Sequence, residues 1–174
     1  MNLSQKNTKL NKPFIQSVML FILSLGACYL AALIGSMATI DAVSTANGWY
    51  ATLIKPPFNP PKWVFGPVWS ALYTLMGVCF YLINRSNPDL HPNKRLFQWV
   101  FIAQLVLNAL WSILFFYFHA LGWAALEIIV LWAVLLWLTV KSKTINPWCR
   151  TLMIPYLLWV SFAAVLSVSI WWGN

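Results

Sequence analysis

Long apolar segments separated by short polar ones dominate the sequence. Five of them are long enough to cross a bilayer as helices, since about 20 apolar residues span its hydrocarbon core. They occupy residues 14–38, 61–84, 96–118, 121–140 and 148–172. Every backbone polar group inside a bilayer needs an internal partner. The pattern therefore predicts an all-α fold, an integral membrane bundle of five transmembrane helices.

The composition supports this prediction and excludes one class of partner. The chain of 174 residues is 61% hydrophobic and only 8% charged, and it holds twelve tryptophans. Its net charge of +8 could suggest nucleic acid. The basic residues, however, lie before or between the apolar segments and not along one face of a domain, so we expect no nucleic-acid partner.

Two polar stretches lie outside the predicted helices. Residues 1–13 form a polar, basic tail, and we expect disorder at its start. The first apolar segment could instead be a signal peptide cleaved near Ser36-Met37-Ala38, but its length and the four spans that follow favour a retained helix. The 39–60 connection is a long loop with several aromatic residues, including Trp49 and Tyr50. It is either a lid over a site or an anchor at the membrane interface.

The distribution of positive charge predicts an orientation. Nine of the eleven lysines and arginines lie on the N-terminal side of the predicted bundle, and only Lys55 and Lys62 lie on the other. Positive charge marks the cytoplasmic side of inner-membrane proteins. We therefore expect a multi-pass protein of the bacterial inner membrane with a cytoplasmic N-terminus, and with the long loop outside.

Conventional catalytic chemistry finds no support in the sequence. No nucleotide-binding loop, metal-ligand spacing, paired carboxylates or nucleophile–base set occurs, so we expect no metal and no obligatory cofactor. Cys28, Cys79 and Cys149 have no pairing pattern. Glu127 is the one acidic residue inside a predicted span. Such groups are functional by default, but its role stays open.

Polar and aromatic residues recur at similar depths in three spans. Gln104, Asn108 and Ser112 are spaced four apart and share one helix face. Trp69 and Trp159 lie roughly 12 and 20 Å from the outer ends of their helices, at 1.5 Å per residue. These positions favour a shared aromatic cavity beneath the long loop, although ordinary hydrogen bonding between helices would also explain the polar stripe.

Several motifs together resemble the TspO/MBR family, the tryptophan-rich sensory proteins related to the translocator protein or peripheral benzodiazepine receptor. Around the second span they are Trp49-Tyr50, Lys55-Pro56, Pro60-Pro61, Trp63-Val64-Phe65, Pro67-Val68-Trp69 and Leu72-Tyr73. In the third and fifth spans they are Asn108, Trp111, Phe115-Phe116, Pro155-Tyr156-Leu157-Leu158-Trp159, Phe162-Ala163 and Leu166. The resemblance runs from the first span to the C-terminus and makes residues 14–174 one five-helix domain.

The resemblance implies a protein that binds porphyrins such as protoporphyrin IX, acting as a sensor, regulator or carrier. The implied alternatives are a light-dependent porphyrin-degrading enzyme, in which Trp69 and Trp159 would be catalytic, and a transporter of porphyrin or lipid-like ligands. It also implies a homodimer in contact with membrane lipid. The implied ligand-binding residues are Trp49, Tyr50, Pro56, Trp69, Asn108, Trp111, Phe115, Trp159, Phe162 and Ala163.

One departure from the family pattern concerns sterols. The proposed sterol motif of the animal members needs a tyrosine and a basic residue, where this chain has Val168 and Trp172. We therefore expect no specific sterol recognition, although such motifs are weak patterns. On the side of the cavity mouth, Lys55 and Lys62 could meet porphyrin propionates, or they could simply anchor the chain at the interface.

Overall fold

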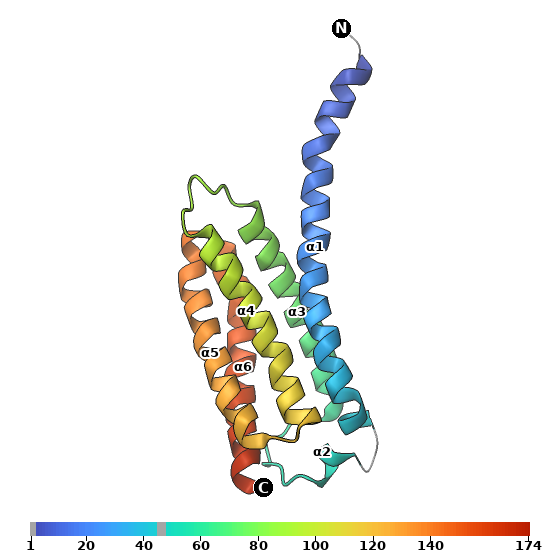
Figure 1. Ribbon diagram of the computed structural model, residues 1–174, viewed down its shortest axis with the longest axis vertical. Coiled ribbons are helices and arrows are strands. Elements are labelled where there is room, and N and C mark those ends of the chain that lie inside the picture. Colours follow the sequence, from blue (N-terminus) through green and yellow to red (C-terminus); the bar gives the residue numbers. More distant parts are fainter. Residues whose placement is uncertain (1–2, 45–47) are drawn as a thin grey trace.

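The computed structural model describes residues 3–44 and 48–174 as a bundle of long helices (Figure 1). Residues 1–2 of the predicted tail and 45–47 of the predicted loop lie outside the described residues. The long helices are α1 (Leu3–Ser44), α3 (Lys62–Arg85), α4 (Lys94–Ser112), α5 (Leu121–Lys141) and α6 (Pro147–Gly173). Three short segments complete them, namely α2 (Trp49–Thr52), the π-helical η1 (Ile113–Tyr117) and the 3₁₀-helical η2 (Ser142–Thr144).

The all-α prediction is confirmed. Within the described residues, five helices are long and apolar enough to cross a membrane. The last four begin and end within two residues of the predicted spans when η1 is counted as the end of α4. Local chemistry sets these boundaries. Pro61 precedes α3, and Pro147 is the first residue of α6, where a missing amide proton costs little. The Asn146 side chain caps α6 by accepting a hydrogen bond of 2.9 Å from the amide of Trp148.

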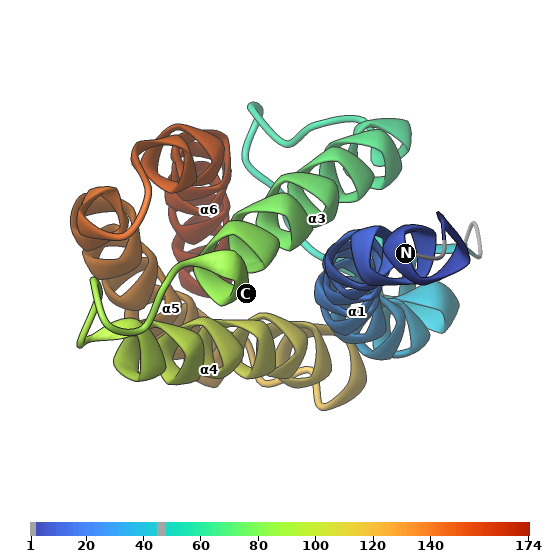
Figure 2. The same cartoon turned by 90° about the horizontal axis from the view of Figure 1, so that it is seen from above.

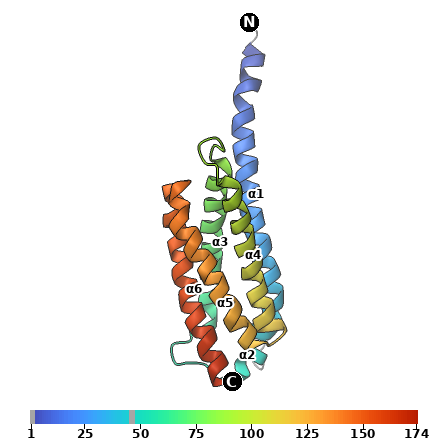
Figure 3. The ribbon, with the colours of Figure 1, turned by 60° about the vertical axis from the view of Figure 1, so that its left-hand side comes forward.

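The first helix is longer than predicted at both ends. The helix α1 begins at Leu3 and ends at Ser44, so it starts within the predicted tail, and the loop predicted from residue 39 begins later. At 1.5 Å per residue its 42 residues extend about 63 Å, and its N-terminal part projects beyond the other helices (Figures 1 and 3). Polar residues alone do not end a helix, and no glycine or proline stands between Leu3 and Lys12 or between Thr39 and Ser44.

The helices form a ring in the order α1, α3, α6, α5, α4, which closes because α4 also packs against α1 (Figure 2). Chain order does not predict this arrangement, since α3 lies beside α6 although two helices separate them in the sequence. The ring brings Trp69 of α3, Trp111 of α4 and Trp159 of α6 to its inner side. The short connections at the N-terminal end and the α2 segment at the other end close the bundle (Figure 1).

The buried core fills mainly the half of the bundle that is remote from the C-terminus. Phe80 of α3 and Phe101 of α4 stack there with ring centres 4.6 Å apart. Met76, Leu135 and Tyr156 are fully buried in the same cluster. The other half has a smaller cluster, so space remains between the helices there.

Helices α1 and α3 approach closely at Gly77. A Cβ atom at this position would lie 2.5 Å from Leu25 Cδ2 and 3.0 Å from Leu25 Cα. Small residues let membrane helices come this near, because no side chain separates the backbones. The glycine therefore fixes where α1 crosses α3.

We expect Gly77→Ala to destabilise the protein, because the new methyl group would force the backbone of α1 away from α3. Overpacking of this kind costs about 1–3 kcal/mol. Thermal unfolding in detergent measures the effect. Gly26→Ala is the matched control, because a Cβ at Gly26 meets nothing within 4 Å. Equal melting temperatures for the two variants would contradict a tight crossing at Gly77.

Candidate ligand-binding site

A cavity of about 780 Å³ lies in the half of the bundle that holds α2 and the C-terminus. Residues of α1, α3, α4, η1 and α6 line it, together with Tyr50 of α2. Among the described residues, none from α5 contributes to the lining. The volume falls within the range of small-molecule sites, about 300–1,000 Å³.

Aromatic side chains from three helices form much of the wall. Trp69 of α3 contacts Tyr73, with ring centres 5.6 Å apart, and Trp159 of α6 contacts Phe65 edge-on at 6.1 Å. Trp111 of α4 stacks on Phe115 at 5.2 Å. Trp69 and Trp159 thus face one hollow rather than opposite lipid-facing sides, as a shared cavity requires.

The π-helix η1 brings two of these aromatic residues to the cavity. Phe115 and Phe116 both line it and contact each other edge-on at 4.8 Å. The wider turn ends where the amide of Phe118 donates to the carbonyl of Ile113 at 3.0 Å, and His119 follows with a φ of 54°. π-Helical turns are often found at functional sites. The sequence did not predict this π-helical turn, because the third span was expected to continue as a regular α-helix to residue 118.

A chain of hydrogen bonds joins α3, α4 and α6 beneath the cavity. The Tyr73 hydroxyl donates to Asn108 Oδ1, and Asn108 Nδ2 donates to the Tyr156 hydroxyl at 2.5 Å. That hydroxyl donates to Gln104 Oε1 at 3.2 Å. Tyr73 and Asn108 line the cavity, whereas Tyr156 and Gln104 are buried behind them. Both interpretations of the predicted polar stripe therefore apply, because it hydrogen-bonds helices to one another and also forms the cavity floor.

Two polar atoms of the cavity wall lack a partner among the described residues. They are the indole Nε1 of Trp111 and the hydroxyl of Ser167, both on residues that line the cavity. A buried polar group without a hydrogen bond costs free energy. Both atoms are themselves enclosed by protein, so a ligand would reach them only if the indole or the hydroxyl turned toward the cavity. Ser167 was noted from the sequence only as a departure from the family pattern.

The segment that covers the cavity is held closed by several contacts. Tyr50 is buried, lines the cavity and donates a 2.8 Å hydrogen bond to Asn59 Oδ1. Trp49 stacks on His119 with ring centres 3.9 Å apart. The Asn174 side chain binds both backbone polar groups of Ile54, at 3.0 and 3.1 Å. These contacts give α2 and the following loop the position of a lid.

The two lysines near the lid differ in their surroundings. Lys62 lines the cavity. The ammonium group of Lys55 instead donates to the backbone carbonyls of Tyr50 and Leu53, at 2.7 and 2.8 Å. Burial lowers the pKa of Lys55, and the positive charge of Lys62 lowers it further. Burial also raises the pKa of Tyr50, against a smaller lowering by its hydrogen bond to Asn59. Lys55 therefore fastens the lid, and Lys62 is the better placed for a ligand's acidic group.

Eight of the ten residues predicted to bind a ligand line this cavity. They are Tyr50, Trp69, Asn108, Trp111, Phe115, Trp159, Phe162 and Ala163. Trp49 and Pro56 are not among the lining residues. Trp49 packs behind the wall on Phe115, and the carbonyl of Pro56 accepts a 3.0 Å hydrogen bond from the amide of Asn59, which holds Tyr50.

Sequence reasoning missed the wall formed by α1. Its lining residues are Tyr29, Ala32, Leu33, Gly35, Ser36, Thr39 and Ile40. The Tyr29 hydroxyl hydrogen-bonds Thr74 Oγ1 of α3 at 2.8 Å. Apart from Tyr29, these residues are apolar or small and resemble any lipid-facing helix surface. Tyr29 and the polar pair Ser36 and Thr39 were the available signal.

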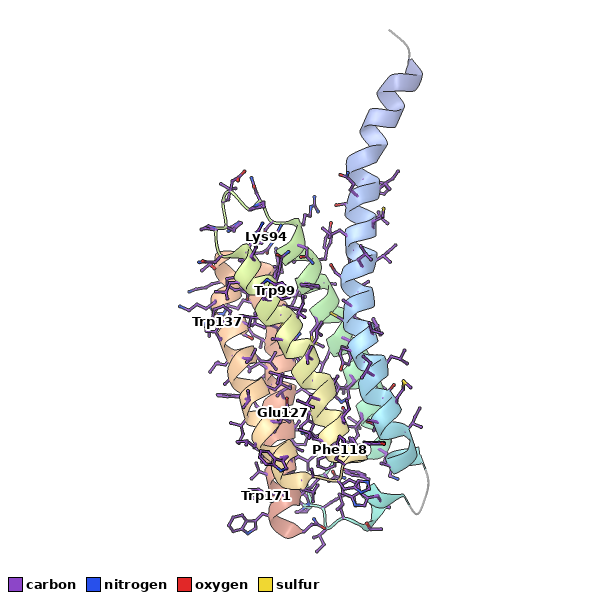
Figure 4. The ribbon with its side chains drawn as sticks, viewed as in Figure 1. Lys94, Trp99, Phe118, Glu127, Trp137 and Trp171 are labelled. Carbon is purple, nitrogen blue, oxygen red and sulfur yellow. The ribbon has the colours of Figure 1, made fainter. Side chains whose placement is uncertain are left out.

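Glu127 lies outside the cavity. It is buried in α5, and neither carboxyl oxygen has a hydrogen-bond partner among the described side chains. Two pairs set the register of α5 against α6, since Gly122 lies at Trp171 and Trp132 donates to the Ser161 hydroxyl at 2.8 Å. Glu127 lies on α5 between these two pairs and is itself buried (Figure 4). An unpaired carboxyl group there is costly to the fold.

Comparisons with known proteins agree with this architecture. The sequence model of the TspO/MBR family matches residues 24–172. The chain is 37% identical to the tryptophan-rich protein TspO of Archaeoglobus fulgidus over 154 residues, covering 88% of this chain and 98% of that one. It is 33% identical to the sheep translocator protein over 126 residues, covering 72% and 75%. It is 32% identical to the tryptophan-rich sensory protein of Cereibacter sphaeroides over 151 residues, covering 85% and 87%.

We expect Asn108→Leu to destabilise the bundle, because it leaves the Tyr73 hydroxyl without its acceptor, while the Tyr156 hydroxyl keeps Gln104 as a partner. The loss should be about 1–3 kcal/mol, the usual cost of an orphaned buried group. Adding Tyr73→Phe should recover much of it, because the orphaned hydroxyl is then gone. Thermal unfolding of the parent protein, the two single variants and the double variant gives the coupling between Tyr73 and Asn108. Additive losses would show that these two residues act independently.

We expect Glu127→Leu to stabilise the protein by about 1–3 kcal/mol, because it removes an unpaired carboxyl group from an apolar interface. Thermal unfolding in detergent is again the measurement. Ser161→Ala should do the opposite at the same α5–α6 interface, because it removes the acceptor of the Trp132 indole. A lower melting temperature for Glu127→Leu would mean that the carboxyl group has a stabilising partner.

Proposed function

Since this chain belongs to the TspO/MBR family, and is thus an integral multi-pass membrane protein, we propose that it binds porphyrin within the membrane as a sensor, regulator or carrier. Names of relatives support this direction only broadly, because one is called a sensory protein and another a translocator protein. The observation that carries the proposal is the aromatic cavity. Three tryptophans from three helices edge a single hollow that is large enough for a drug-sized ligand.

The cavity chemistry suits a flat aromatic plate with an acidic edge. Trp69, Trp111 and Trp159 offer ring faces and edges, and such aromatic contacts add about 0.5–1.5 kcal/mol each beyond burial. The unpaired polar groups of Trp111 and Ser167 can bond polar atoms of the ligand if they turn toward the cavity. Lys62 supplies positive charge among the lining residues, where propionate groups would find an opposite charge. In this arrangement the plate enters the hollow, and its acidic edge lies toward Lys62.

The proposed orientation follows from charge. The basic end of the bundle, with α1's N-terminus and the α3–α4 connection, faces the cytoplasm by the positive-inside rule. The lid and the cavity then lie in the outer half of a bacterial inner membrane. A porphyrin would thus be held on the side away from the cytoplasm. From there, α1, α3, α4 and α6 would extend across the membrane to the cytoplasmic side.

Light-dependent breakdown of the bound porphyrin is a second candidate function. It is favoured by one observation, namely that the indoles of Trp69 and Trp159 both face the cavity in which the pigment would lie. Indole is a readily oxidised side chain. Oxygen would be the oxidant, and an illuminated sample compared with a dark one separates this activity from binding alone.

We expect purified protein in detergent to bind protoporphyrin IX, which would shift the pigment's absorbance band and quench tryptophan fluorescence. Trp69→Phe and Trp159→Phe should each weaken binding about 2–10-fold, because phenylalanine keeps an aromatic ring but loses part of the contact area. Trp99→Phe is the matched control, because Trp99 lies on α4 near the other end of the bundle and is 69% exposed (Figure 4). It should bind as the parent protein does.

The outcomes separate the candidates. Equal loss in all three variants would indicate a general effect of removing indoles and would contradict the cavity as the site. Normal dark binding by Trp69→Phe, with loss of light-dependent product, would favour breakdown over binding alone. No spectral change at micromolar porphyrin would overturn both.

A further inference from the structure

A second hollow lies between α1 and α3, at the end of the bundle opposite the lid. It encloses about 500 Å³ and is lined by Phe14, Ser17, Val18, Phe21, Tyr81 and Arg85. None of these residues lines the aromatic cavity. Both helices cross the membrane, so this groove opens toward lipid along its apolar part and reaches the interface at Arg85, the last residue of α3.

The polar edge of the groove is organised around Tyr81. Its hydroxyl accepts a 3.1 Å hydrogen bond from Arg85 Nη1 and lies 3.1 Å from Ser17 Oγ. The guanidinium group has five N–H donors, and one serves this bond. No ion pair joins Arg85 to an acidic side chain in the part of the chain that the structure describes, so the groove presents a positive charge beside two hydroxyl groups.

Lys94, the neighbouring basic residue, has a structural role. The ammonium group of Lys94 donates to the backbone carbonyls of Asn84 and Ser86, at 2.6 and 2.7 Å. It therefore satisfies carbonyls at the C-terminal end of α3, which need partners. Arg85 is the basic residue that faces the groove.

The rest of the groove is apolar and accessible. Phe14 is 69% exposed and Val18 is 40% exposed, while Phe21 packs edge-on against Tyr81 with ring centres 5.4 Å apart. From Ser17, which lies level with Tyr81, α1 continues through Val18 and Phe21 to its crossing with α3 at Leu25, and so toward the middle of the membrane. An acyl chain would cover Val18 and Phe21, with its headgroup at the basic edge.

We propose that this groove binds an anionic phospholipid. The phosphate group accepts hydrogen bonds from Arg85 and from the hydroxyl groups of Ser17 and Tyr81, and one acyl chain lies along Val18 and Phe21. Charge complementarity selects the occupant, because nine of the eleven basic residues lie at this end of the bundle and anionic headgroups concentrate beside such a surface. The lipid fills the space between α1 and α3 and binds them together.

Native mass spectrometry of delipidated full-length protein tests the proposal, with phosphatidylglycerol and phosphatidylcholine of identical acyl chains as probes. We expect phosphatidylglycerol to bind about fivefold more tightly, the factor for one basic residue near an anionic surface, roughly 1 kcal/mol. Arg85→Gln should remove this preference. Arg150→Gln is the matched control, because Arg150 is an exposed arginine at the same end on α6, which α3 separates from α1 (Figure 2). It should keep the preference.

A second variant tests the apolar part. Val18→Trp fills the groove and keeps Arg85, so it should weaken binding of both lipids, while thermal unfolding in detergent reports that the bundle is intact. Equal binding of the two lipids by the parent protein, or the same loss in Arg85→Gln and Arg150→Gln, would overturn the proposal. Displacement of the lipid by inorganic phosphate alone would also overturn it, because the site would then hold a free anion.

Discussion

Helices inside a bilayer gain little by burying apolar side chains against one another, because lipid tails are equally apolar. This constraint makes close packing and interhelical hydrogen bonds decisive for the bundle. The bonds among Tyr73, Asn108, Tyr156 and Gln104 join three helices at the level where the cavity begins. Between this level and α2 the ring of helices can stay open, because the hydrogen bonds already fix the helices at the inner end of the cavity. The polar groups that hold the helices together also end the hollow.

The structure divides into a filled half and a hollow half. In the filled half, pairs such as Phe80 and Phe101 stack closely and leave no space for a ligand. In the hollow half, tryptophans occupy the wall without meeting at the centre, and the π-turn of η1 directs Phe115 and Phe116 inward. Wide rings on a rigid frame give a large apolar surface that loses little conformational freedom when it meets a flat ligand.

The sequence predicted the four later spans closely because charged, proline and asparagine residues interrupt the apolar runs at their ends. It also predicted most of the cavity wall, because tryptophan and asparagine inside a span stand out. It predicted the membrane-spanning part of α1 within two residues, but it missed that the polar flanks continue the helix and that α1 lines the cavity, because its lining residues look like an ordinary lipid-facing surface. The ring order and the π-turn depend on contacts between distant segments, such as α3 with α6, and no local pattern encodes them.

The close crossing at Gly77 has a mechanical consequence for α1. Leu25 meets α3 there, while residues 29–40 form one wall of the aromatic cavity and residues 14–21 border the groove between α1 and α3 on the other side of the crossing. A stiff rod pressed against its support at one point turns about that point like a lever. A swing that widens the groove at one end of the rod therefore shifts the cavity wall at the other, so the two hollows are not mechanically independent.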